Sequence, residues 1–111
     1  MTRTADRRVA KVVELMTEQY GKRWTVESMA DVVHLSPDRL RHLFVRDCGE
    51  PPAAYLRKLR LKKAQHLLLT TELSVKQVAA KVGFEDRSHF NAAFRKRFAC
   101  SPGSLRRHSP C

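Results

Sequence analysis

The chain contains one pattern of residues twice, and this internal repeat restricts its fold more than any other feature of the 111 residues. The first copy reads Thr25-Val26-x-x-Met29-Ala30-x-x-Val33-x-Leu35. The second copy, 49 residues later, reads Ser74-Val75-x-x-Val78-Ala79-x-x-Val82-x-Phe84. Beyond the turn the copies match 50 residues apart, at Leu40 and Phe90, Phe44 and Phe94, and Pro52 and Pro102. The second copy therefore has one extra residue at the start of its second helix.

Each copy has the pattern of a helix-turn-helix unit, in which a short helix is followed by a tight turn and a second helix. A small residue in the first helix, Ala30 or Ala79, lets the two helices cross closely. Four residues later the turn requires a positive φ, which Gly83 supplies in the second copy. His34 takes that place in the first copy, and we expect this departure to cost stability or to reshape the turn.

Helical spacing of apolar residues continues outside the two copies. A first amphipathic helix is predicted before Gly21 from Val9, Val12, Val13, Met16 and Tyr20. A long helix is predicted from about Ala53 to Leu69, and helix starts are predicted at Thr25, Ser36-Pro37, Ser74, Asp86 and Ser101-Pro102. Strand-like alternation is absent, so the predicted class is all-α, with two helix-turn-helix subdomains joined by a long central helix and about seven helices. The single predicted domain, 1–111, comprises a first subdomain (7–52), a linking helix (53–70), a second subdomain (71–107) and a tail (108–111).

The charge of the chain points to a polyanionic partner. Lys and Arg number 22 and Asp and Glu number 11, which gives a formal net charge of +11. Six basic residues and no acid lie between Arg87 and Cys111, and the central helix adds five more. The sequence has neither an apolar run of membrane-spanning length nor an apolar stretch near Met1, so we expect a cytoplasmic protein without a membrane partner.

The residues that could carry other chemistry do not form a recognisable pattern. The three cysteines, Cys48, Cys100 and Cys111, are an odd number without a CxxC pair, which argues against a regular disulfide framework and a structural zinc site. The five histidines do not form a helical pair with a carboxylate partner. The sequence also lacks a set of nucleophile, base and orienting group. We therefore predict that the chain is not an enzyme and needs neither a metal nor a cofactor.

Three segments resemble the AraC/XylS family of bacterial transcription regulators. Leu35-Ser-Pro-Asp-Arg-Leu-Arg-His-Leu-Phe44 is similar to the first recognition helix of that family, and Tyr55 to Leu68 is similar to its central linking helix. The segment from Val78 to Lys96, with its Val-Gly-Phe-x-Asp-x-Ser-x-Phe core, resembles the second helix-turn-helix signature. The resemblance covers about residues 7 to 107. The chain departs from the family pattern at His34, Ala99 and Leu105, which puts local turns and terminal packing in question.

The resemblance implies that two recognition helices enter successive major grooves on one face of double-stranded promoter DNA. Adjacent grooves lie about 34 Å apart, so one monomer is sufficient for a two-part site. If the spacing of the helices does not match straight DNA, the duplex has to bend.

On the first recognition helix, the matching base-facing positions hold Asp38, Arg41 and His42, which share a face away from the apolar residues. Arg41 is the strongest candidate, because arginine can form two hydrogen bonds with guanine. His42 could donate to guanine or contact a phosphate. Asp38 could accept from cytosine or complement the helix dipole, and the dipole role is favoured.

On the second recognition helix, the resemblance places Arg87, Ser88, His89, Asn91 and Ala92 at groove-facing positions. Arg87 is expected to read guanine and Asn91 to read adenine, while Ala92 could touch a thymine methyl group or only permit close approach. The predicted phosphate contacts, for which a solvated helix face is the alternative, are Arg57, Lys62, Arg95, Lys96 and Arg97.

Three hypotheses for the function remain open. The favoured one is the excised DNA-binding domain of a larger, effector-responsive transcription regulator. A free-standing small activator that contacts RNA polymerase is an alternative form of it. The third is a non-specific nucleic-acid or nucleoid protein, which would bind every sequence equally and depend steeply on salt.

Overall fold

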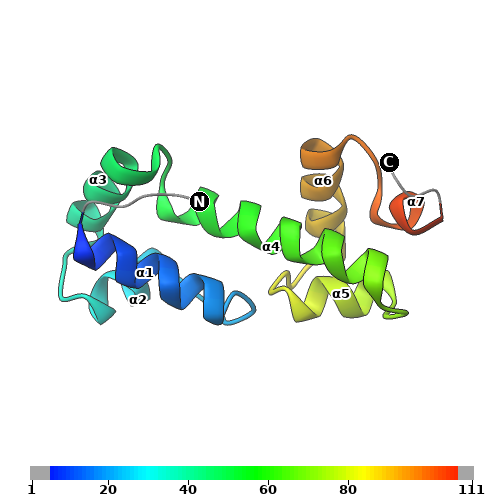
Figure 1. The fold of residues 1–111 in the computed structure, drawn as a ribbon, viewed down its shortest axis with the longest axis horizontal. Helices are drawn as coiled ribbons and strands as arrows, with labels where there is room; N and C mark the ends of the chain where they lie inside the picture. Colours follow the sequence, from blue (N-terminus) through cyan, green and yellow to red (C-terminus); the bar gives the residue numbers. More distant parts are fainter. Residues whose placement is uncertain (1–5, 108–111) are drawn as a thin grey trace. The chain divides into compact units, whose positions relative to one another are not determined.

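The computed structural model describes residues 6–107, which form seven α-helices and, within that range, no strand (Figure 1). The predicted all-α class is confirmed. The predicted tail, 108–111, lies outside the described residues. The helices are α1 (Arg7–Glu18), α2 (Val26–Val32), α3 (Pro37–Cys48), α4 (Pro52–Thr70), α5 (Val75–Lys81), α6 (Arg87–Phe98) and α7 (Pro102–Arg107). None of these seven helices is long and apolar enough to cross a membrane.

The chain divides within α4, between Lys58 and Leu59, into two compact units. In the first unit, α3 packs against both α1 and α2. The side chains of Leu40 and Phe44 on α3 are fully buried. The ring of Phe44 meets that of Tyr55 on α4 edge-on, with 5.4 Å between centroids. This packing fixes which side of α3 faces the solvent.

The core of the second unit contains a row of aromatic rings. Phe90 and Phe94 on α6 are fully buried, and consecutive ring centroids along Phe84, Phe90, Phe94 and Phe98 lie 5.2, 5.7 and 4.6 Å apart. Such tilted aromatic pairs add to the free energy gained by burial. On α7, Leu105 is also buried, so leucine fills the place for which the family pattern has an aromatic residue.

The predicted helix starts are confirmed by the hydrogen bonds of their capping side chains. Thr25 and Ser74 each accept a bond from the backbone of the third helical residue, Ser28 or Gln77, whose side chain bonds back to the cap. Ser36 caps α3, which has Pro37 at its first position, and Asp86 caps α6. These bonds satisfy backbone N–H groups that have no partner within the helix.

The last residue of the first helix and the covalent state of two cysteines differ from the sequence expectation. α1 ends at Glu18, so Tyr20 lies beyond it rather than on its apolar face. Cys48 keeps a free thiol, whose pKa is raised by burial and by the nearby Asp47 and Glu50. Cys100 is disulfide-bonded, which the spacing of the cysteines did not indicate.

The two copies share a positive φ at two pairs of matching positions, although the residue types there differ. Gly83 has a φ of 99° and His34, in the same turn of the first unit, has a φ of 57°. At the ends of α3 and α6, Gly49 has a φ of 80° and Ala99 a φ of 62°. The turn of the first copy therefore has the positive φ that the pattern requires, with histidine in place of glycine. Ala99, the second departure from the family pattern, also keeps the conformation that glycine adopts most readily.

Gly83 is required for a second reason, which is the approach of Arg60 from α4. A Cβ atom at position 83 would lie 2.8 Å from Nε of Arg60. The Arg60 side chain is half-buried, and burial lowers its pKa. A side chain at position 83 would therefore require the guanidinium of Arg60 to move.

We predict that Gly83→Ala destabilises the protein more than Gly49→Ala does. Both substitutions force alanine into positive φ, at a cost of about 1–2 kcal/mol, but a Cβ at Gly49 would meet no atom within 4 Å. Thermal or urea unfolding measures the two losses. In an Arg60→Ala background the excess cost of Gly83→Ala should shrink. An excess that is unchanged there would exclude the close approach as its cause.

Candidate nucleic-acid interface

The helix α3 presents its three predicted base-reading residues on one exposed face. Asp38, Arg41 and His42 are exposed, while Leu40 and Leu43 point into the core. This division follows from the 3.6-residue period of the helix, in which residues three and four apart share a face. The sequence prediction that these three side chains share a solvent face is correct.

Asp38 and Arg41 form an ion pair with each other, which the sequence analysis did not consider. Nη1 of Arg41 donates to Oδ1 of Asp38 at 2.9 Å, and the aspartate side chain is 96% exposed. An exposed pair of this kind contributes little to stability. It leaves the Nε–Nη2 edge of the guanidinium, the edge with two parallel N–H groups, directed away from the carboxylate. Asp38 also lies in the first turn of α3, where its charge complements the helix dipole.

On α6, the exposed face is centred on Ser88, His89 and Ala92. These three residues are exposed, while Phe90 and Phe94 are buried on the opposite side. The ring of His89 packs edge-on against that of Phe84, with 5.6 Å between centroids. Because residues four apart lie on one line along a helix, Arg87 and Asn91 form a flank of this face.

Asn91 is less accessible than its predicted role in reading adenine requires. The residue is half-buried, and its Oδ1 atom is buried without a hydrogen-bond partner among residues 6–107. Bidentate recognition of adenine uses both the oxygen and the nitrogen of the amide. In this conformation Asn91 offers at most one of the two, so a bidentate contact requires its side chain to rotate.

The predicted phosphate-binding residues are all exposed. Arg57 and Lys62 lie on α4, and Lys58 beside them donates to Glu50 at 3.0 Å. The last turn of α6 holds the other three, Arg95, Lys96 and Arg97. There they also complement the negative end of the helix dipole, so their charge has a structural use in the free protein.

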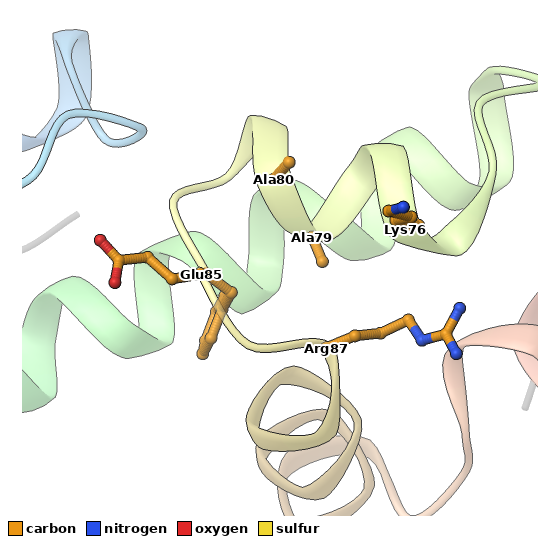
Figure 2. Close-up of a pocket in the computed structure, with 6 residues that line it drawn as sticks. Lys76, Ala79, Ala80, Glu85 and Arg87 are labelled. Atoms are coloured by element: carbon orange, nitrogen blue, oxygen red, sulfur yellow. The ribbon is translucent and has the colours of Figure 1, made fainter.

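A hollow of about 360 Å³ opens between α5 and the start of α6 (Figure 2). Two cationic side chains, Lys76 and Arg87, line it together with Glu85, and the rest of its lining is apolar: Ala79, Ala80 and Phe84. Lys76 is not among the residues predicted from the sequence to bind DNA. Comparison of the two copies could have found it, because the corresponding residue of the first copy is Glu27.

Metal chemistry finds no support in this part of the chain. Within residues 6–107, no three His, Cys, Asp or Glu side chains lie where they could hold a metal ion together.

Comparison with known proteins gives the family of the chain. A family profile described as "Helix-turn-helix domain" matches residues 29–108. The RCS-specific HTH-type transcriptional activator RclR of Escherichia coli is 38% identical over 99 residues, which cover 89% of this chain and 35% of RclR. The chain thus spans about a third of the length of this curated relative.

Two solved structures have the same fold. The C-terminal domain of AraT, a response regulator from Geobacillus stearothermophilus, aligns with a TM-score of 0.88 and 30% identity, over 92% of this chain and 85% of that one. The DNA-binding domain of AdpA, described as a global transcriptional factor and solved in complex with a target DNA, aligns with a TM-score of 0.88 and 28% identity, over 92% of each chain.

The chain therefore belongs to the AraC/XylS family of helix-turn-helix DNA-binding domains. It has the helix-turn-helix fold of the DNA-binding domains of this family of transcription regulators.

We predict that Asn91→Leu raises the free energy of unfolding, by up to about 1 kcal/mol. The substitution removes a buried oxygen that lacks a partner, and the desolvation of such a group costs about 1–3 kcal/mol. Packing of the larger leucine side chain offsets part of this gain in stability. Urea unfolding measures the change. Asn91→Asp is the matched control and should destabilise, because it places a charge at the same site. A clear loss of stability with Asn91→Leu would show that the amide has a stabilising partner.

Proposed function

We propose that α3 and α6 are the recognition helices of this domain and enter successive major grooves on one face of the DNA. The proposal rests on one observation: a helix with an exposed polar face and a buried apolar face occurs twice. Each of the two helices has 12 residues, starts at a capping side chain and buries the matching pair of large apolar residues. Since a recognition helix reads bases with its N-terminal residues, Arg41 and Ser88 stand where base contacts are made.

On α3, Arg41 reads a guanine, and Asp38 orients it. The carboxylate holds Nη1 of Arg41 at 2.9 Å and leaves the Nε–Nη2 edge for O6 and N7 of the base. A guanidinium fixed in this way loses less conformational entropy on binding DNA. His42, on the same face, donates to a neighbouring base or phosphate.

On α6, Ser88, His89 and Ala92 line the centre of the groove. Ala92 is exposed and small, which suits close approach to a thymine methyl group. Asn91 contributes one amide hydrogen bond or, after rotation, two to adenine. Arg87 lies at the flank, where either a base edge or the DNA backbone is within its reach.

The remaining cations set affinity and register. Contacts to phosphates carry no sequence information, but they position a protein on the duplex. Exposed side chains on α4 and in the last turn of α6 suit this role: Arg57, Lys62, Arg95, Lys96 and Arg97.

The parent protein is, in this proposal, a larger cytoplasmic regulator that responds to an effector and acts at promoters. Its support is the length of RclR, of which this chain covers 35%. The domain binds as a monomer, because it holds two reading helices. A contact with RNA polymerase, as in a small free-standing activator, is compatible with it and would use other surfaces. Non-specific binding by charge alone does not account for two repeated helix faces.

Selection from random DNA sequences with the purified protein tests the proposal. We expect enrichment of a two-part site whose segments are centred about one helical turn, roughly 10 base pairs, apart. The readout is sequencing of the bound pool, followed by competition binding with scrambled sites. Enrichment of a single short segment would contradict reading by both helices. A pool without any enriched sequence would favour binding by charge alone.

Arg41→Ala is expected to weaken binding to the selected site by about 1–3 kcal/mol and to relax preference at one base pair. Asp38→Ala should relax the same base pair to a smaller extent. If Asp38 acts through Arg41, the double variant loses less than the sum of the two single losses. Binding to the selected duplex and to duplexes changed at one position measures these effects. Strictly additive losses of binding free energy, or loss of preference at different base pairs, would show that Asp38 does not act through Arg41.

A further inference from the structure

The hollow between α5 and α6 has its charges separated. Figure 2 shows the side chains of Lys76 and Arg87 toward one end of the view and the carboxylate of Glu85 toward the other. Ala79 and Ala80 lie between them in this view (Figure 2), and Phe84 also lines the hollow. Lys76 and Arg87 are both exposed. A shallow surface with cations at one end and an apolar base can hold an anionic group that is attached to an apolar one.

The internal repeat provides a comparison within the same chain, because the first copy has the same backbone and different charges. Lys76 corresponds to Glu27, 49 residues earlier, and Ala80 corresponds to Asp31. Arg87 corresponds to Pro37, 50 residues earlier. Glu85 falls at the one-residue insertion of the second copy. The pair of cations thus belongs to the second unit, and the fold of the repeat does not require it.

The two units differ in the charges at the starts of their helices. The first turns of α2 and α3 hold Glu27 and Asp38, which complement the positive ends of their helix dipoles. The first turns of α5 and α6 hold no acidic residue, and they hold Lys76 and Arg87 instead. On α6, Arg87 directly follows Asp86, whose carboxylate caps the helix, so only Lys76 on α5 lies at a positive helix end without an acidic residue in the same turn. A bound anion would compensate the charges of Lys76 and Arg87.

We propose that this hollow binds a phosphodiester of the DNA strand that borders the groove entered by α6. Lys76 and Arg87 would contact the phosphate oxygens, and the apolar residues would lie against the adjoining deoxyribose. The inference rests on the proposed function, since it requires α6 to lie in a major groove. In this inference Arg87 contacts a phosphate, in place of the guanine contact predicted from the sequence. The second unit would then carry an electrostatic anchor that the first unit lacks.

Salt dependence of binding tests the anchor. The whole chain is titrated, at several salt concentrations, with a duplex carrying its selected site and with a scrambled duplex of equal length. Lys76→Ala and Arg87→Ala should each weaken binding to both duplexes by the same factor and reduce the slope of log K against log salt by about 1. Lys76→Glu, which installs the residue of the first copy, should have a larger effect. Lys81→Ala, an exposed lysine at the other end of α5, is the matched control and should leave the slope close to that of the wild type.

A duplex with single methylphosphonate linkages, which are uncharged, locates the phosphate. One linkage beside the segment read by α6 should weaken wild-type binding, and the same linkage should cost Lys76→Ala much less. Thermal unfolding of each variant confirms that it folds; removal of either cation should leave the melting temperature unchanged or raise it.

The outcomes separate this inference from the function on which it rests. Wild-type protein that shows no preference for any duplex contradicts the proposed function itself. Wild-type protein that binds its site, with Lys76→Ala behaving like Lys81→Ala, overturns the anchor alone. If Arg87→Ala relaxes one base pair and keeps the full salt slope, Arg87 reads a base and the hollow does not hold a phosphate through it.

Discussion

Burial of two large apolar side chains on each recognition helix is the interaction on which the rest of this structure depends. On α3 these are Leu40 and Phe44, and on α6 they are Phe90 and Phe94, all with no exposed surface. Each pair is four residues apart, so it anchors one side of its helix to the core over a full turn. The opposite side is then forced into the solvent. The surface that we propose to face DNA is therefore a consequence of packing, and truncation of Phe44, Phe90 or Phe94 would cost about 3–5 kcal/mol.

The turns show that the fold tolerates residues other than glycine at positions with a positive φ. His34 and Ala99 both adopt positive φ, at positions where the other copy has glycine. The conformational cost falls on the two residues, while their units keep the helix crossing and the helix end that the repeat requires. At Gly83 a Cβ would in addition displace the guanidinium of Arg60, which occupies the space beside this glycine. Two turns with the same conformation therefore differ in how far their sequence can vary.

Charge gives the two units different properties on one scaffold. The first unit has acidic residues in the first turns of α2 and α3, in agreement with the helix dipoles, and the second unit has basic residues there. A net charge of +11 raises the rate and strength of association with DNA in general. Its unequal distribution leads us to assign the salt-dependent part of binding chiefly to the second unit. An ion pair between Asp38 and Arg41 moderates the charge of α3, where we expect sequence to be read.

The sequence by itself determined the helices, their caps, the two positive-φ turns and the exposed faces of α3 and α6. These features are local or periodic: Thr25 and Ser74 cap through bonds within four residues, and helical spacing alone separates Arg41 from Leu40. Only the tertiary structure decided three others, namely the buried oxygen of Asn91, the approach of Arg60 to Gly83, and the meeting of Lys76 with Arg87 in one hollow. Each depends on where a side chain points or on how closely two helices pack. A one-dimensional pattern assigns a residue to a face, but it contains neither the rotamer nor the distance across to the neighbouring helix.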